Sequence, residues 1–151
     1  MARFKFRLQT FLNVKEMMEK NIRNELGIAV QQYQYQLSVL SDIRREISDQ
    51  QEEFRKEGVS ETTPLKLKQR LEYIKAVQKK ERIQTDRVNE EKRNVDKIRK
   101  RLTEVMKEKK ILENLKERQL VEFRKGQEKK QQLVVDEIVS FKETVTPQNE
   151  L

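Results

Sequence analysis

The sequence predicts an all-α fold, a long two-helix antiparallel coiled-coil hairpin in which the second helix is longer than the first. A short segment holding Gly58 and Pro64 separates two long stretches that lack proline. Each stretch carries apolar residues at sevenfold spacing, the spacing of a coiled-coil seam. Hydrophobic residues make up 34% of the chain and charged residues 40%. That composition fits either disorder or a thin helical rod, and the periodicity favours the rod.

The whole chain, residues 1–151, is expected to form a single hairpin domain. Its helices are expected over about 8–56 and 64–144, with a turn at 57–63 and a frayed tail at 145–151. Gly58 can take the positive φ that ends a helix. Thr63 can cap the second helix, and Pro64 suits its first position.

The first helix carries a mainly apolar seam with one half-filled companion row. The seam residues are Leu12, Glu19, Leu26, Tyr33, Leu40, Ile47 and Phe54, with companions Ile22, Ala29 and Ile43. Tyr35 and Gln36, in the uncharged stretch 30–40, are expected to face away from this seam. There they form either a contact patch or an ordinary surface.

The second helix repeats this pattern. Its seam residues are Leu67, Ile74, Glu81, Val88, Val95 and Leu102, with companions Val77, Ile98 and Val105. A reversal near residue 60 places Phe54 opposite Leu67, Ile47 opposite Ile74, Tyr33 opposite Val88 and Leu26 opposite Val95. Leu40 then faces Glu81, a weak point of the seam.

On this register the second helix extends beyond the amino-terminal end of the first helix. Leu8 lies opposite Glu113, so residues after about 117 are expected to extend beyond the first helix. They still hold apolar residues at helical spacing, namely Leu120, Phe123, Val134, Ile138 and Phe141. An apolar stripe without cover in its own chain predicts either a partner from another chain or self-association.

At the amino end, Phe4, Phe6 and Leu8 alternate with basic residues. One interpretation is that these side chains fold back onto the second helix as a staple. The other is an apolar, cationic tip that contacts another protein.

The residue types present argue against catalysis and against a resident metal or cofactor. The chain has no cysteine, histidine or tryptophan, and its three glycines are isolated. Thiolate and imidazole ligands, the usual nucleophile systems and a glycine-rich phosphate loop are therefore missing. No run of about 18 apolar residues is present, so we expect a cytoplasmic protein without a membrane span.

Positive charge is concentrated between residues 87 and 130, which hold 16 Lys and Arg against 9 Asp and Glu. This segment is either an ordinary solvated helix face or a surface for nucleic-acid phosphates. Interspersed acids and the lack of an aromatic stacking platform argue against nucleic acid.

The opening FKFRLQTFLNVKE resembles the start of the FliJ family, small coiled-coil components of the bacterial flagellar type III export apparatus. The motif falls on Phe4, Phe6, Arg7, Leu8, Gln9 and Glu16. The closing QLVVDEIVSFK is similar to the family's second signature, at Asp136, Glu137, Ile138 and Phe141. LEYIKAVQ is similar to its second-helix pattern, at Tyr73, Ile74 and Val77.

The resemblance implies a non-enzymatic central stalk that couples ATP hydrolysis to protein export at the inner face of the cell membrane. Its implied partners are the hexameric export ATPase, the membrane protein of the export gate, and substrate chaperones. Membrane association would come only through these partners. Ring contact would fall on Phe4, Phe6, Arg7, Leu8, Asp136, Glu137 and Ile138. Gate contact would fall on Gln36, Leu40, Ile43, Ile47, Tyr73 and Val77.

Alternatives remain open both for three of these residues and for the function of the chain. For Leu40, Ile43 and Ile47, packing within the seam is the simpler role. For the chain as a whole, the alternatives are a basic coiled coil that binds nucleic acid and a homodimeric scaffold.

Overall fold

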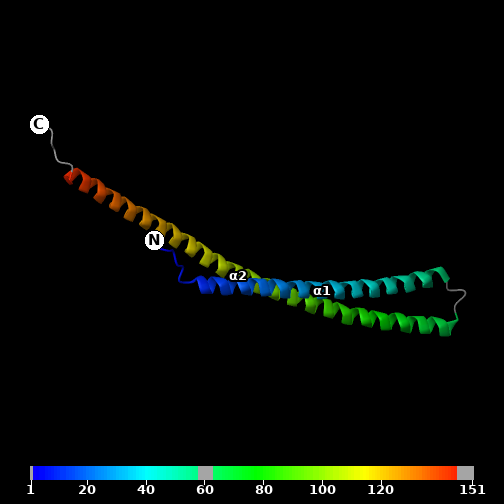
Figure 1. Cartoon of the computed structure of the whole chain (residues 1–151). Helices are drawn as coiled ribbons and strands as arrows, with labels where there is room; N and C mark the ends of the chain where they lie inside the picture. The colour runs from blue at the N-terminus through cyan, green and yellow to red at the C-terminus, as the bar shows by residue number, and fades with distance from the viewer. Residues whose placement is uncertain (1, 58–62, 146–151) are drawn as a thin grey trace. The chain divides into compact units, whose positions relative to one another are not determined.

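The computed structural model describes residues 2–57 and 63–145, and these form two helices and no strand. Helix α1 (Gln9–Glu57) has 49 residues and helix α2 (Pro64–Val145) has 82 (Figure 1). The predicted fold class is confirmed, including the longer second helix. Of the turn expected at 57–63, residues 58–62 lie outside the described residues, and so do residues 146–151 of the frayed tail expected at 145–151. Glu57 and Val145 are the last residues of α1 and α2. That the whole chain is one domain stays a prediction.

The start of α2 is capped by the residue that the sequence indicated. The Thr63 side-chain oxygen accepts a hydrogen bond from the backbone N–H of Lys66 at 3.3 Å, and the Thr63 carbonyl accepts one from Leu67 at 3.0 Å. Pro64 follows at the first helical position, where its missing N–H costs nothing. Local sequence therefore sets this helix boundary.

The chain divides into two compact units. The hairpin unit comprises Met18–Glu104 and contains most of α1 with the first half of α2. The terminal unit comprises Met1–Met17 and Val105–Leu151.

The core of the hairpin unit is the predicted seam. Its buried apolar residues are Ile22, Ala29, Leu40 and Ile43 of α1 with Val77, Val88, Val95, Ile98 and Leu102 of α2. The other predicted apolar seam positions in this unit are half-buried, namely Leu26, Tyr33, Ile47, Phe54, Leu67 and Ile74. Each well-buried apolar side chain contributes roughly 1.5–3 kcal/mol. The sevenfold pattern thus identified the packed face of both helices.

Contacts between the two helices follow the antiparallel order. The pairs are Arg70 Nη1 with Glu57 Oε2 at 2.7 Å, Arg44 Nε with Glu81 Oε1 at 3.2 Å, and Arg101 Nη1 with Glu25 Oε1 at 3.1 Å. As the residue number falls along α1 it rises along α2. Arg44 also supplies the seam residue Glu81 with a counter-charge, which offsets the weak point expected there.

A polar layer crosses the seam at Gln36 and Gln84. Gln84 is 3% exposed, and its Nε2 donates to the Gln36 carbonyl oxygen at 3.0 Å and to Gln36 Oε1 at 2.6 Å. The expectation that Gln36 faces away from the seam is therefore wrong. Gln36 occupies the companion row of α1, seven residues from both Ala29 and Ile43, so its side chain faces the seam. There it accepts the hydrogen bond that the buried Gln84 amide needs.

In the terminal unit, the amino-terminal segment before α1 folds back onto α2. The rings of Phe4 and Phe123 lie 5.6 Å apart, tilted by 51°, and Phe6 is buried. Lys15 forms an ion pair with Glu108 of α2. The staple, one of the two interpretations of this motif, is what the structure shows.

This staple moves the start of the uncovered part of α2. Leu120 and Phe123 were expected to be uncovered, yet both are half-buried, and the last half-buried residue of α2 is Gln127. Each described residue from 128 to 145 is exposed. The physical reason is reach: a non-helical chain spans about 3.3 Å per residue against about 1.5 Å in a helix, so a few residues cover several helical turns.

Replacing Ile98 by alanine tests the seam. Ile98 is 4% exposed, and its truncation should lower the free energy of unfolding by about 2–4 kcal/mol through lost burial and a residual cavity. Urea denaturation followed by circular dichroism measures this change. The neighbouring exposed residue Lys97 is the control, since Lys97→Ala should change stability by less than about 0.5 kcal/mol. Equal effects of the two substitutions would contradict the described seam.

Candidate functional site

Four of the six residues assigned to gate contact belong to the packed seam. Leu40, Ile43 and Val77 are buried, and Ile47 is half-buried. Seam packing, the simpler role considered for the first helix, thus accounts for these side chains. A partner could reach the buried ones only where the two helices separate.

The other two gate residues differ in accessibility. Gln36 is half-buried and bonded to Gln84. Tyr73 is 44% exposed, and its hydroxyl donates a hydrogen bond to the Glu46 carboxylate of α1. This bond raises the pKa of the Tyr73 hydroxyl above its ordinary value of 10.0, since it holds the proton against a negative charge. Tyr73 is therefore the assigned gate residue best placed for contact with a partner.

On another face of the hairpin unit, Ile28 and Tyr35 are exposed on α1, at 61% and 65%. A shallow hollow of about 530 Å³ lies beside them and is also lined by Gln31 and Glu91. Tyr35 thus faces away from the seam, as predicted, and an uncharged aromatic surface flanks a single carboxylate.

The amino-terminal residues assigned to ring contact lie against α2. Phe6 is buried, Phe4 and Leu8 are half-buried, and Arg7 is exposed. The Phe6 carbonyl also accepts the backbone N–H of Gln9 at 3.1 Å, which ties the segment to the start of α1. Of this group, Arg7 is the most accessible.

The carboxyl-terminal residues of the same assignment lie elsewhere on α2. Asp136, Glu137 and Ile138 are exposed, and Asp136 accepts a hydrogen bond from Gln132 at 3.2 Å. Asp136 follows Phe123, the contact of Phe4, by about thirteen residues, or about 20 Å of helix. The structure therefore does not bring the two assigned motifs together.

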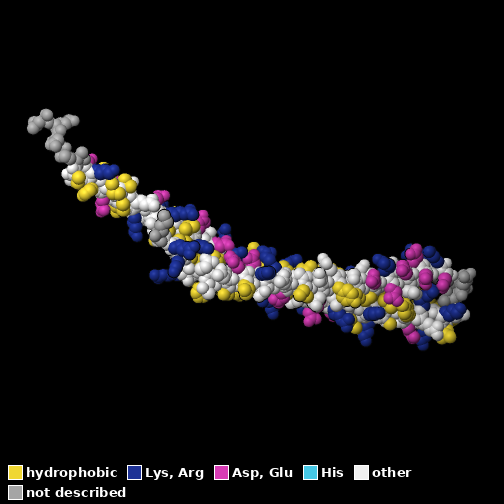
Figure 2. All heavy atoms as spheres, in the orientation of Figure 1, with side chains coloured by type: hydrophobic (Ala, Val, Ile, Leu, Met, Phe, Trp, Pro, Cys, Tyr) yellow, Lys and Arg dark blue, Asp and Glu magenta, His cyan; other side chains and the backbone are white. Residues whose placement is uncertain are grey.

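The last turns of α2 carry a row of exposed apolar side chains in the terminal unit. We call Val134, Ile138, Phe141 and Val145 the end stripe; their exposed fractions range from 50% to 67%. At about 100° per residue they fall within one narrow sector of the helix. Figure 2 shows hydrophobic side chains gathered over this part of α2. Asp136 lies on the opposite side, so only Ile138 of the assigned trio belongs to the stripe.

One sector of the α2 surface contains both half-buried residues and the exposed residues of the end stripe. Leu120, Phe123 and Gln127 lie in the sector of the end stripe one to several turns earlier, and they are half-buried beside the amino-terminal segment. Three members of the stripe, Val134, Ile138 and Phe141, were predicted from the sequence; Val145 was not, although it continues the same spacing. The exposed neighbours Leu133, Val135 and Val139 were not predicted either.

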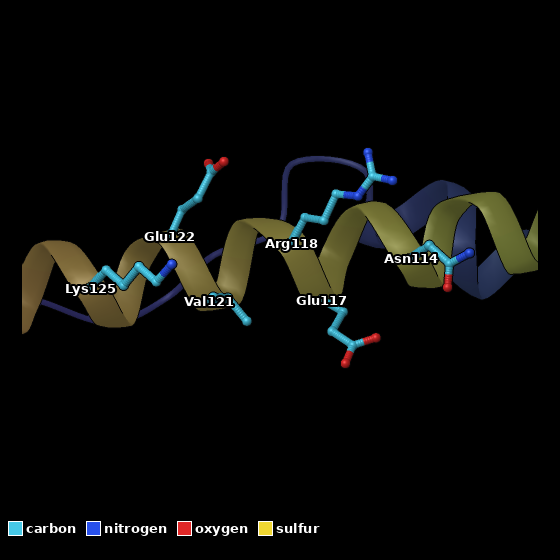
Figure 3. A pocket seen from close by; sticks show the side chains of 6 residues that line it. All are labelled: Asn114, Glu117, Arg118, Val121, Glu122 and Lys125. Carbon is cyan, nitrogen blue, oxygen red and sulfur yellow. The ribbon is translucent and has the colours of Figure 1, made fainter.

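A hollow of about 440 Å³ runs along α2 in the terminal unit. Figure 3 shows the side chains that line it, which project to different sides of one helix. Glu117, Glu122, Arg118 and Lys125 thus do not converge on a common point. Within residues 2–57 and 63–145, no group of three or more acidic side chains is placed to hold a metal ion.

Neither described helix contains a stretch long and apolar enough to cross a membrane.

Comparison with known proteins gives one match. The profile of the flagellar FliJ protein family matches residues 4–143. Searches of curated proteins and of solved structures found no match.

The contact between Tyr73 and Glu46 can be tested by titration. With Tyr33 and Tyr35 replaced by phenylalanine, Tyr73 is the remaining tyrosine, and its phenolate absorbance should appear at higher pH than that of free tyrosine. Glu46→Gln should return the pKa towards 10 because the negative charge is gone. Because the folded-state pKa is raised, the contact stabilises the fold below about pH 10 and is lost as the pH rises through the raised value.

A titration curve that the Glu46→Gln substitution leaves unchanged would show that the hydroxyl is not bonded to the carboxylate in solution. Glu52→Gln, which alters an exposed carboxylate of the same helix, is the control and should have no effect on the curve.

Proposed function

The chain belongs to the FliJ family and is a component of the flagellar export apparatus, and we propose that it acts there as a non-enzymatic central stalk. In this proposal it binds the hexameric export ATPase and the export gate, and it couples ATP hydrolysis to protein export. In this proposal the protein is located in the cytoplasm, at the inner face of the cell membrane, where its partners hold it. Escort of substrate chaperones is a further part of the proposed role.

The observation that carries this proposal is the uncovered end stripe. A water-exposed row of Val134, Ile138, Phe141 and Val145 favours burial against another protein. The four side chains lie on one side of the helix, so a partner can cover them with a single apolar groove. We place the ring contact here, with Ile138 at its centre.

A charged residue beside the stripe favours one arrangement of this contact over others. Glu137 borders the stripe's sector and suits a polar group at the rim of the interface, where charges favour specificity over affinity. Asp136, on the opposite side of the helix, lies outside this contact. Arg7 is the accessible member of the amino-terminal motif. Phe4 and Phe6 then act indirectly, by holding the segment that carries Arg7 against α2.

The proposed coupling of ATP hydrolysis to export depends on a difference in symmetry, since one asymmetric stalk contacts a ring of six subunits. A single asymmetric helix end offers different contacts to different subunits, so it favours different states of the ring around its circumference. Because coupling between binding and subunit state is reciprocal, the stalk's position and ATP turnover influence each other. In the hairpin unit, Tyr73 is the accessible residue of the proposed gate contact.

Nucleic acid is not a partner in this proposal. Basic residues of α2 pair with acids on the same helix or across the hairpin, as in Lys109 with Glu113 at 3.7 Å and Arg101 with Glu25 at 3.1 Å. The positive charge is therefore partly neutralised where a phosphate backbone would need it.

The test is the ATPase rate of the purified export ATPase with this chain at a few-fold excess. The wild-type chain should raise the rate and favour ring assembly. Ile138→Glu should remove most of the stimulation, since burying an unpaired carboxylate in an apolar groove costs several kcal/mol. Ser140→Glu is the matched control, because it adds the same charge to the polar side of the same turn and should leave stimulation nearly intact.

If the wild-type chain changed neither the ATPase rate nor the oligomer size, the stalk role would be wrong. Equal loss of stimulation in the two variants would show that charge alone, and not the stripe, governs the effect.

A further inference from the structure

The end stripe has the spacing of a two-stranded coiled coil, and we propose that it pairs two copies of this chain in parallel. The pair would cover the stripe when no other partner occupies it. This inference goes beyond the proposed stalk role and concerns the chain alone, before it meets the export apparatus.

Heptad positions can be assigned along the uncovered part of α2. Val134 and Phe141 take position d, while Ile138 and Val145 take position a, with Gln131 at the preceding a. Residues 131–145 are helical and exposed, so all five side chains are available together. Side chains branched at Cβ, such as Ile138 and Val145, favour two parallel strands when they occupy position a.

Charges beside the stripe select the parallel orientation. Glu137 takes position g and Lys142 takes position e of the following heptad. In a parallel pair, g of one strand faces this e of the other, so Glu137 meets Lys142 of the second copy twice by symmetry. In an antiparallel pair g faces g and e faces e, and this complementarity is lost.

The small contact predicts a weak, reversible dimer. Five layers of a and d residues, about two heptads, bury much less surface than a standard protein interface. The strands are nonetheless extensions of a long existing helix, so pairing does not have to form a new helical turn. Dimer and proposed ring contact use the same side chains and therefore exclude each other.

The first test is sedimentation of the full chain alone over a concentration series that reaches hundreds of micromolar. The mean mass should rise from that of one chain towards that of two. Ile138→Glu should keep the chain monomeric, because it places two carboxylates face to face in the seam. Ser140→Glu, at position c, should dimerise like the wild type.

The second test is a charge exchange. Glu137→Lys and Lys142→Glu should each weaken dimerisation about tenfold, since each turns two attractive pairs into repulsive ones. The double variant should restore the wild-type dissociation constant. If a single variant weakened dimerisation only by destabilising the helix, the double variant would not restore the dissociation constant.

The third test fixes the orientation. The chain has no cysteine, so Val134→Cys can form a disulfide only with a second copy. A parallel pair brings the two introduced thiols within disulfide distance, whereas an antiparallel pair centred on the stripe separates them by several turns. Ser140→Cys is the matched control and should cross-link poorly.

A chain that stays monomeric at every concentration would overturn the proposal. So would a dimer insensitive to Ile138→Glu, or one that does not cross-link through residue 134. None of these measurements includes the ATPase, so their failure leaves the ATPase test standing; a monomer whose stripe still stimulates the ATPase would assign the stripe to the ring alone.

Discussion

The structure depends on one narrow apolar seam between two helices. A seam residue is covered by the facing helix and not by a surrounding core, so even the best-covered apolar side chains, Leu12, Ala29 and Val95, keep 3% of their surface exposed. Stability is therefore distributed along the seam in small local contributions. It also follows that any apolar residue of α2 without a facing segment stays in contact with water. The end stripe is the direct result of this geometry.

The amino-terminal segment shows how few residues are needed to cover such a helix. Phe4 and Phe6 reach α2 from a short non-helical stretch, and the residues of α2 are partly shielded as far as Gln127. Packing thus gives this motif a structural role, because residues that resemble a family signature are also residues that close the terminal unit.

Sequence alone predicted the fold well because a coiled coil is encoded by local periodicity. Leu40, Val88 and Ile98 could be placed in the seam from spacing alone, and Thr63 from capping chemistry. Gln36 was misplaced although it continues the row of Ala29 and Ile43, because a polar side chain was expected on the surface; its hydrogen-bond partner Gln84 is distant in the sequence. The half-burial of Phe123 was missed for another reason, since a helical repeat does not indicate how far a non-helical segment reaches. Contacts with other proteins leave still less trace, since the exposure of Ile138 leaves an apolar side chain accessible and does not identify a partner.

The polar layer of Gln36 and Gln84 has a mechanical consequence. Two helices joined by a purely apolar seam can slide past each other by one heptad, about 10 Å, and recover most of their packing. Such a slip here would strand the buried Gln84 amide opposite apolar side chains. One amide pair thus favours the observed register of the hairpin unit over a register shifted by one heptad.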